Sequence, residues 1–222
     1  MKLVLAAGVA AAALVVAAPA NATNECRGLN PCVAVAGPWV VVDPRPATVQ
    51  FQLTCPRGYS VGGTDAELTD RGIDLAFLAV SGAPVSPGIT TGRTIVFVAT
   101  YAGTSMRAST FRPHIGCIPA AGGRRTPTAA APVVPPGTPT VRRVITARIG
   151  GTKGIVTSCH ENERLLDWYA TRAFATAAPP PPALVASLTF TARRVANSAT
   201  VLAHARRGQG IVQVGAVCAG GR

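Results

Sequence analysis

The sequence predicts an exported, all-β protein made of two tandem, small antiparallel β-sandwich modules of the Ig or fibronectin-like kind, each closed by a disulfide. Three observations support this prediction. The chain starts with an apolar, alanine-rich stretch, it carries six cysteines, and its apolar residues alternate with polar ones in short runs separated by glycine and proline. This combination is typical of exported β-sandwich proteins.

Residues 1–22 have the pattern of a signal peptide. Lys2 supplies a positive start, an apolar stretch follows, and Ala20-Asn21-Ala22 matches a small-residue cleavage site. The apolar stretch is almost long enough to span a bilayer, so a retained anchor is the alternative. Because most of it is alanine, we favour cleavage. We therefore expect a secreted, extracellular or cell-surface-associated protein with no transmembrane segment after cleavage.

The cysteines follow the signal peptide in a repeated order. Two pairs are 62 and 59 residues apart, and a third pair is close together near the expected mature start. An even cysteine count in an exported chain favours disulfides, and no C-x-x-C spacing suggests zinc or redox chemistry. Six cysteines can pair in many ways, and the repeated spacing favours one of them. The favoured pairs are Cys26–Cys32, Cys55–Cys117 and Cys159–Cys218.

The chain divides into four segments after the signal peptide. Residues 23–38 form an N-terminal lead with a local cysteine pair, and residues 39–119 form β-sandwich module 1. Residues 120–140 hold five prolines and no acidic residue, which predicts an extended linker. Residues 141–222 form β-sandwich module 2. As an alternative, Val133 and Val134 of the linker pack as an edge strand.

Module 1 opens with two strand-like runs. Trp39–Val42 is continuously apolar, and the alternation of Val49–Leu53 is that of a strand with one buried face. A proline-rich turn separates the runs, so we expect a hairpin that ends at Cys55.

Further along module 1, Ile73–Phe77 alternates, and the β-branched run Thr94–Tyr101 suits a strand buried on both faces. Thr64–Glu67 matches a helical capping box, but Gly72 leaves room for only about one turn of helix.

Module 2 repeats this order. The alternating segment Val141–Ile149, a glycine-rich turn and Ile155–Ser158 predict a second hairpin. Leu184–Ala192 alternates like a strand, and Ile211–Val214 leads to the last cysteine. Glu163–Phe174 contains good helix formers, but its distance from the preceding cysteine matches that of a strand region in module 1, which favours a strand.

Five short stretches carry a resemblance to known sequences: Cys55–Tyr59, Gly62-Gly63, Phe111–Pro119, Glu163–Leu165 and Val212–Cys218. They resemble secreted, uncharacterised proteins of high-GC actinobacteria that carry tandem cysteine-bounded β repeats. In module 2, Cys159-His160 replaces the Cys-Pro of module 1, so the repetition is not strict. The resemblance implies an exported β-repeat protein and carries over no activity or active-site residue.

Catalytic and metal chemistry find little support. His160, Glu161 and Glu163 beside Cys159 invite a metal site, but adjacent strand residues point to opposite faces and the cysteine is expected to be bonded. We expect no metal and no cofactor.

The alternative function is a secreted hydrolase with an unrecognised active site around His114 or His160. No G-x-S-x-G motif is present, and a hydrolytic histidine needs a nucleophile and an acid beside it. We expect His114 at the end of a closing strand and His204 on an exposed face. The acidic residues Asp65, Glu67, Asp70 and Asp74 are expected on a solvated loop.

A third functional class is a disulfide-braced inhibitor, which would need an exposed, rigid loop. Ser81–Arg93 is the segment best placed for one.

The charge is lopsided. The net charge is +12, and residues 118–222 carry 13 basic groups against 3 acidic ones. GC-rich coding DNA explains part of the arginine excess, and selection for an anionic partner is the competing explanation. Aromatic residues do not interleave with the arginines and the protein is exported, so no nucleic acid is expected. The arginine pairs are Arg124-Arg125, Arg142-Arg143, Arg193-Arg194 and Arg206-Arg207.

These observations predict a secreted, non-enzymatic binding or structural protein. Its candidate anion-binding residues are Arg193, Arg194, Arg206 and Arg207, because guanidinium groups fork onto carboxylates and phosphates. The expected partner is an anionic cell-wall polymer or surface component. The sequence does not predict the oligomeric state.

Overall fold

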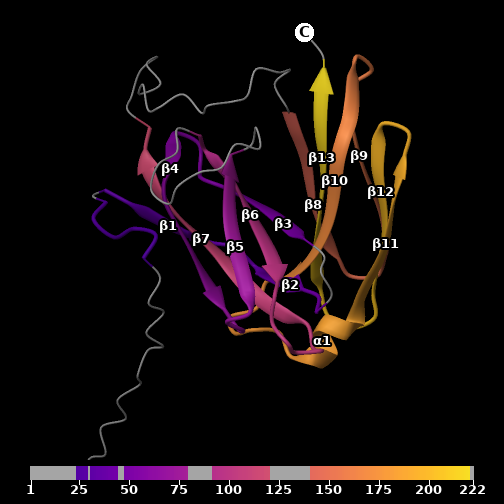
Figure 1. Cartoon of the computed structure of the whole chain (residues 1–222), viewed down its shortest axis with the longest axis horizontal. Helices are drawn as coiled ribbons and strands as arrows, with labels where there is room; N and C mark the ends of the chain where they lie inside the picture. Colours follow the sequence, from indigo (N-terminus) through magenta and orange to yellow (C-terminus); the bar gives the residue numbers. More distant parts are fainter. Residues whose placement is uncertain (1–23, 30, 45–47, 80–91, 121–140, 221–222) are drawn as a thin grey trace, which may run out of the picture.

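A computed structural model of the chain describes residues 24–29, 31–44, 48–79, 92–120 and 141–220 (Figure 1). The predicted signal peptide and nearly all of the proline-rich linker lie outside these residues. The described part is all-β, with one short helix, α1 (Pro182–Ser187). The strands of the first half are β1 (Val33–Ala36), β2 (Trp39–Val42), β3 (Val49–Thr54), β4 (Tyr59–Leu68), β5 (Ile73–Ala79), β6 (Thr94–Tyr101) and β7 (Ser109–Pro119). The strands of the second half are β8 (Val141–Ile149), β9 (Thr152–Ser158), β10 (Glu163–Phe174), β11 (Leu188–Val195), β12 (Ser198–Ala205) and β13 (Gly210–Gly220).

One antiparallel sheet, here called the central sheet, runs through both halves of the chain. Its order is β4-β7-β2-β10-β13-β8, and β1 pairs with β7 beyond the end of β2. The halves meet where β2 pairs with β10, with Val40 opposite Ala173 and Trp39 opposite Phe174. Backbone hydrogen bonds of the central sheet therefore join the two halves.

Two three-stranded sheets cover the central sheet. The first-half sheet has the order β3-β6-β5, and the second-half sheet has the order β11-β12-β9 (Figure 1). They pack on opposite faces of the central sheet. Val40 and Val42 of β2 belong to the core under the first-half sheet, whereas Val41 between them belongs to the core under the second-half sheet.

This arrangement explains the continuous apolar run of β2. All four of its residues are buried, with at most 3% of their surface exposed. A strand that has a core on each face has no polar side to alternate with. The sequence pattern of Trp39–Val42 is thus the signature of the shared strand between two cores.

The edge of β3 is sealed by polar side chains of the second half. The Gln52 amide N–H donates to Gln213 Oε1 at 2.6 Å, and Gln213 Nε2 donates to the Gln52 carbonyl at 3.0 Å. Thr171 Oγ1 donates to the Gln50 carbonyl at 2.7 Å. An edge strand exposes unpaired backbone groups, and these contacts satisfy them from the central sheet.

The two halves pair their strands in the same pattern. β7 pairs with β2 and β4, as β13 pairs with β8 and β10. β6 pairs with β3 and β5, as β12 pairs with β9 and β11. In the first half, β4 follows Cys55 and lies beside β7, which carries Cys117. In the second half, β10 follows Cys159 and lies beside β13, which carries Cys218.

The disulfides are the three that the spacing favoured. Cys26–Cys32 closes the lead, Cys55–Cys117 links the first-half sheet to β7, and Cys159–Cys218 links the end of β9 to β13. The last two hold a covering sheet against the central sheet. None of the helices in the described residues has the length and apolarity needed to cross a membrane.

Both predicted hairpins are wrong. β2 and β3 belong to different sheets, and so do β8 and β9. Their apolar faces meet across a core, as the packing of Val40 with Phe51 in one core and of Ile149 with Ile155 in the other shows. Alternation correctly predicted the strands, but the turns cross between layers instead of closing a hydrogen-bonded pair.

Two local predictions also differ. Leu184–Ser187 is the end of α1 and not part of a strand, which begins only at Leu188. Four consecutive prolines, Pro179–Pro182, lead into α1. The last of them is the first residue of the helix, a position that suits proline. Thr64–Glu67 is strand and not helix, because it lies within β4. Glu163–Phe174 is the strand that its position favoured.

Replacing Gln213 with leucine is expected to lower the free energy of unfolding by about 3 kcal/mol. The Gln213 residue is 2% exposed, and its loss leaves the Gln52 amide and carbonyl without partners in the junction between the halves. Denaturant unfolding measures the change. Gln209→Leu is the control, since Gln209 is exposed. Equal stabilities of the two variants would contradict the role given to Gln213.

Candidate functional site

The four candidate arginines lie at opposite ends of one hairpin. Arg193 and Arg194 are near the end of β11, next to the turn into β12. Arg206 and Arg207 directly follow the far end of β12. The two pairs therefore make two separate basic positions on the second-half sheet.

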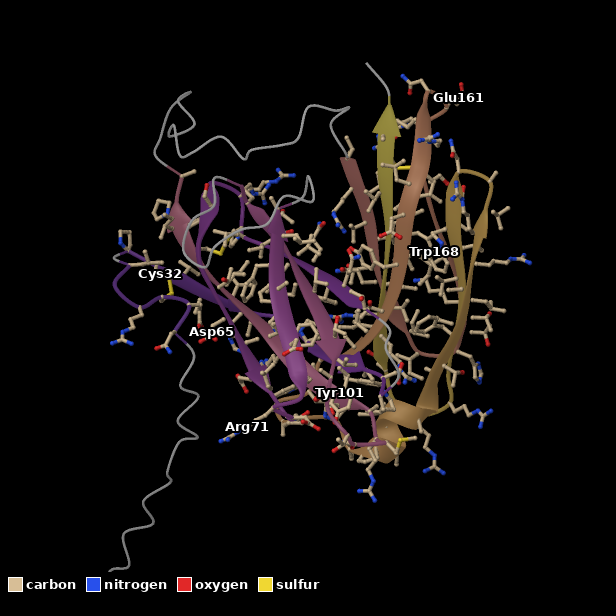
Figure 2. All side chains as sticks on the ribbon, viewed as in Figure 1. Cys32, Asp65, Arg71, Tyr101, Glu161 and Trp168 are labelled. Carbon is tan, nitrogen blue, oxygen red and sulfur yellow. A yellow bond between two sulfur atoms is a disulfide. The ribbon has the colours of Figure 1, made fainter. Side chains whose placement is uncertain are left out.

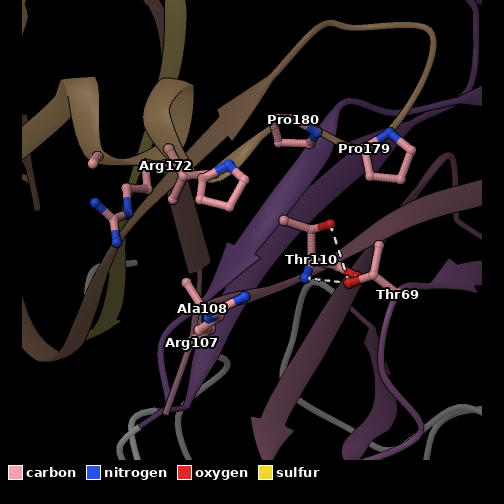
Figure 3. Close-up of a pocket in the computed structure, with 10 residues that line it drawn as sticks. Thr69, Arg107, Ala108, Thr110, Arg172, Pro179 and Pro180 are labelled. Carbon is pink, nitrogen blue, oxygen red and sulfur yellow. Dashed lines mark hydrogen bonds between the residues drawn. The ribbon is translucent and has the colours of Figure 1, made fainter. Parts of the chain in front are cut away.

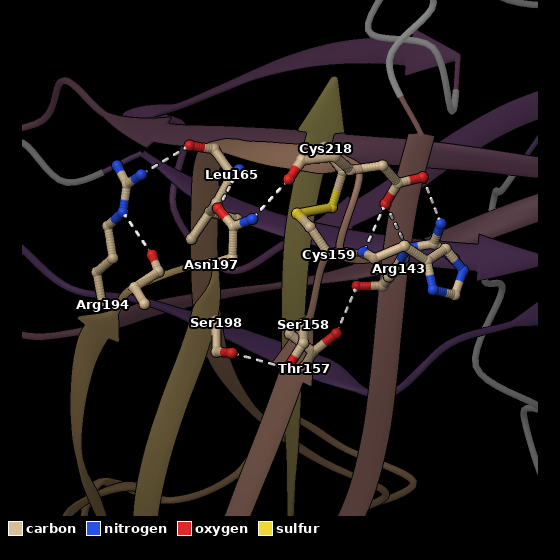
Figure 4. Close-up of a disulfide and its surroundings, with 12 residues drawn as sticks. Arg143, Thr157, Ser158, Cys159, Leu165, Arg194, Asn197, Ser198 and Cys218 are labelled. Carbon is tan, nitrogen blue, oxygen red and sulfur yellow. Dashed lines mark hydrogen bonds and ion pairs between the residues drawn. A yellow bond between two sulfur atoms is a disulfide. The ribbon is translucent and has the colours of Figure 1, made fainter. Parts of the chain in front are cut away.

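Arg194 is the most restrained of the four. Its Nε donates to the Ala196 carbonyl at 3.2 Å, and its NH2 donates to the Leu165 carbonyl at 2.9 Å (Figure 4). The neighbouring Arg193 is exposed on the outer face of the sheet, beside a cavity that Thr200 and Leu202 also line. Arg194 thus braces the turn, whereas Arg193 is available to a ligand.

Arg206 and Arg207 have fixed backbones and exposed side chains. The Arg206 amide donates to the Ser187 carbonyl of α1 at 2.9 Å. Ser187 Oγ donates to the Arg207 carbonyl at 3.1 Å, and Ser187 itself is buried. The structure therefore presents two guanidinium groups to solvent from a rigid base.

Arg142 and Arg143, in contrast, are used inside the fold. Arg142 NH1 donates to Gln50 Oε1 at 2.6 Å, and its guanidinium lies 6.0 Å from the centre of the Tyr169 ring. Burial lowers the pKa of Arg142 below its usual value, but an arginine stays charged. Arg143 makes a two-armed contact with Glu163, at 2.6 and 3.1 Å. The Arg124-Arg125 pair lies outside the described residues.

The second long disulfide has a carboxylate beside it. Ligand atoms of Cys159, Cys218 and Glu163 lie within 4.8 Å of one another (Figure 4). Both sulfurs are already bonded to each other, and Glu163 is held by Arg143 and by the His160 amide, at 2.9 Å. The cluster is thus a braced disulfide, and Glu161, labelled in Figure 2, stays exposed.

His114 is the histidine with acidic neighbours. It lies in the interior of β7 and not at the strand end as predicted, and 6% of its surface is exposed. Its Nε2 is 2.9 Å from Glu67 Oε1, and its Nδ1 is 3.6 Å from Glu25 Oε1. Glu25 belongs to the N-terminal lead, so the buried histidine ring lies between carboxylates of the lead and of β4.

Glycines let the lead approach the central sheet. A Cβ at Gly63 or Gly116 would collide with the Glu25 carbonyl, so only glycine fits at these positions. The Asn24 amide donates to Asp65 Oδ2 at 2.6 Å, and Figure 2 labels Asp65 and Cys32 of the lead. The lead is therefore a packed part of the fold.

The acidic residues predicted on a solvated loop are mostly structural. Asp65 and Glu67 lie in β4. Asp70 accepts hydrogen bonds from the Gly72 amide at 2.8 Å and from the Tyr101 hydroxyl at 2.9 Å, which lower the pKa of its carboxyl. Asp74 is exposed as expected, but it lies in β5 and not on a loop. His204 is also exposed, as predicted, and its Nδ1 lies 2.8 Å from Thr152 Oγ1.

The proposed inhibitor loop, Ser81–Arg93, lies outside the described residues apart from its last two residues. The structure holds instead a pocket for which the sequence offered no signal. It has a volume of about 400 Å³ and lies between β7, β10 and α1 (Figure 3). Its walls come from segments far apart in the chain, which is why no local motif marks it.

No protein-family model, no curated protein and no solved structure matches this chain.

Glu25→Gln is expected to loosen the N-terminal lead. The neutral amide keeps the size of the side chain but removes its charge from beside His114, and Glu25 is 6% exposed. Hydrogen exchange of the Leu29 amide, bonded to the Cys26 carbonyl, should become faster. Arg27→Gln, an exposed change in the same lead, should leave the rate unaltered. Unchanged exchange in Glu25→Gln would refute the contact's role.

Glu163→Gln is expected to destabilise the protein at about pH 7 and to matter less at about pH 3. The Arg143 hydrogen bonds, followed by that of the His160 amide, lower the pKa of Glu163 in the folded state. The stabilisation that the ionised Glu163 carboxylate provides is therefore present above its unfolded pKa of about 4.3. It is lost as the pH falls through the lower pKa of the folded state. Unfolding at several pH values measures this, with exposed Glu161→Gln as control. A difference that does not vary with pH would contradict it.

Proposed function

We propose that this protein is a secreted, non-enzymatic binding module that contacts anionic polymers of the cell envelope through Arg193, Arg206 and Arg207. The observation that carries this proposal is the exposure of these three arginines on a rigid sheet. Among the described residues, no carboxylate forms an ion pair with any of them. Free guanidinium groups on a fixed support suit repeated carboxylates or phosphates.

The surrounding charge supports the same partner. Residues 118–222 hold 13 basic groups and 3 acidic ones, and Glu163 is already neutralised by Arg143. A polymer that approaches the second half therefore meets a positive field with few local counter-charges. Such a field raises the association rate and makes binding sensitive to salt.

Export and modular organisation are parts of this proposal. The signal-peptide pattern of residues 1–22 and three disulfides are consistent with an oxidising compartment. The matching strand-pairing patterns of the two halves support two tandem Ig-like sandwich modules derived from a repeat. They are also what a relation to secreted actinobacterial repeat proteins would produce.

The experiment is retention of the mature, oxidised protein on immobilised dextran sulfate, with neutral dextran as the blank matrix. Replacing Arg193, Arg206 and Arg207 together with glutamine should move elution to clearly lower salt. The matched control replaces Arg27, Arg148 and Arg164 with glutamine, which removes the same charge from other exposed positions. Salt-independent retention, or an equal effect of both triple variants, would overturn the assignment of the site.

A further inference from the structure

The pocket between the halves lies on the face of the central sheet that the second-half sheet partly covers. Thr110 of β7 and Arg172 of β10 contribute from the central sheet, and Val185 contributes from α1 (Figure 3). The loop before β7 contributes Arg107 and Ala108. Its volume of about 400 Å³ falls within the usual range of small-molecule sites, about 300–1,000 Å³.

The wall on the α1 side is apolar and stiff. It consists of Pro179, Pro180 and Pro182 together with Val185 and Ala186. Proline has no backbone N–H and a fixed φ, so this wall offers no donors and changes little on binding. A preformed apolar wall lowers the cost of ordering the site when a ligand enters.

The Thr69 hydroxyl is already engaged with the backbone of Thr110, and the Thr110 hydroxyl lies 3.4 Å from it. Thr69 Oγ1 donates to the Thr110 carbonyl at 3.0 Å and accepts from the Thr110 amide at 2.8 Å (Figure 3). These threonines therefore contribute their methyl groups more than new hydrogen bonds. A ligand rich in hydroxyl groups would find few partners here.

Two arginines, Arg107 and Arg172, are among the residues that line the pocket. Arg107 is exposed, and no ion pair with it occurs within the described part of the chain. Arg172 NH2 contacts Asp43 at 2.6 Å and NH1 donates to the Leu188 carbonyl, but its buried Nε has no partner among the described residues. Positive charge beside an apolar wall selects an anionic, amphipathic ligand.

We propose that this pocket binds an aliphatic monocarboxylate, with the carboxylate at Arg107 and Arg172 and the aliphatic chain against the prolines and α1. The site goes beyond the proposed polymer contact, because neither Arg193, Arg206 nor Arg207 lines it. The pocket accommodates one small apolar body, whereas a polyanion is recognised by exposed charges on an open face.

The test is calorimetric titration of the full, oxidised protein with acetate, hexanoate, decanoate and decanol. Affinity should rise along the acid series by up to roughly fourfold per methylene, since each buried methylene contributes a similar transfer free energy. Decanoate should bind more tightly than decanol. Arg107→Gln should weaken decanoate binding about tenfold, because it removes a charged partner from an exposed loop.

A steric variant separates this pocket from binding elsewhere. Ala186→Trp fills it from an exposed position of α1, and Ala183→Trp places the same side chain on the same helix outside the lining. Decanoate binding should be lost in the first variant and kept in the second. Absence of saturable binding, retention of binding by Ala186→Trp, or equal affinity for decanol would each overturn the proposal. If only the retention on dextran sulfate failed, the proposal for this pocket would still stand.

Discussion

The fold depends on β2 being buried on both faces while it pairs with strands on both sides. Val40 and Val42 fill one core, Val41 fills the other, and β10 of the second half pairs along the edge that β7 leaves free. Removing either half would expose a fully apolar strand and an unpaired sheet edge, which is both unstable and prone to aggregation. Each half therefore completes the other, and the central sheet makes one structure from two similar sets of strands.

Polar contacts define how the layers sit on this sheet. Apolar packing alone tolerates small sliding between layers, whereas Gln213 meets both backbone groups of Gln52 in only one register. Thr171 adds a second contact two residues along β3. Because these groups are buried, any shift would leave them without partners at a cost comparable to a lost core methyl group or more. The junction is thus specified by hydrogen bonds and stabilised by the cores on either side.

Alternation predicted several of the strands and the cysteine spacing predicted the disulfides, but neither indicated which strands lie side by side. Alternation in Val49–Leu53 shows which side chains face a core, but carries no information about which strand lies beside it. Both hairpin predictions were wrong for this reason. The six residues of α1 are too few for periodicity to separate helix from strand, and the contact of Glu25 with His114 joins residues 89 positions apart. The residues of the pocket and of the junction could not be predicted either, because the central sheet brings them together from distant segments of the chain.

The arginines show why net charge alone could not locate a binding surface. Arg142, Arg143 and Arg172 lie in the same basic half as the exposed pairs, but all three hold parts of the fold together through side-chain hydrogen bonds. Arg194 does the same at a turn. A guanidinium group engaged in this way cannot turn away without loss of a structural contact, so it can meet a ligand only with a donor that is still free, such as the buried Nε of Arg172. Of the four candidate arginines, Arg193, Arg206 and Arg207 are exposed and form no ion pair within the described residues. Other basic residues of this half, such as Arg148 and Arg164, are exposed as well, so the candidate surface is defined by position on the β11–β12 hairpin and not by exposure alone.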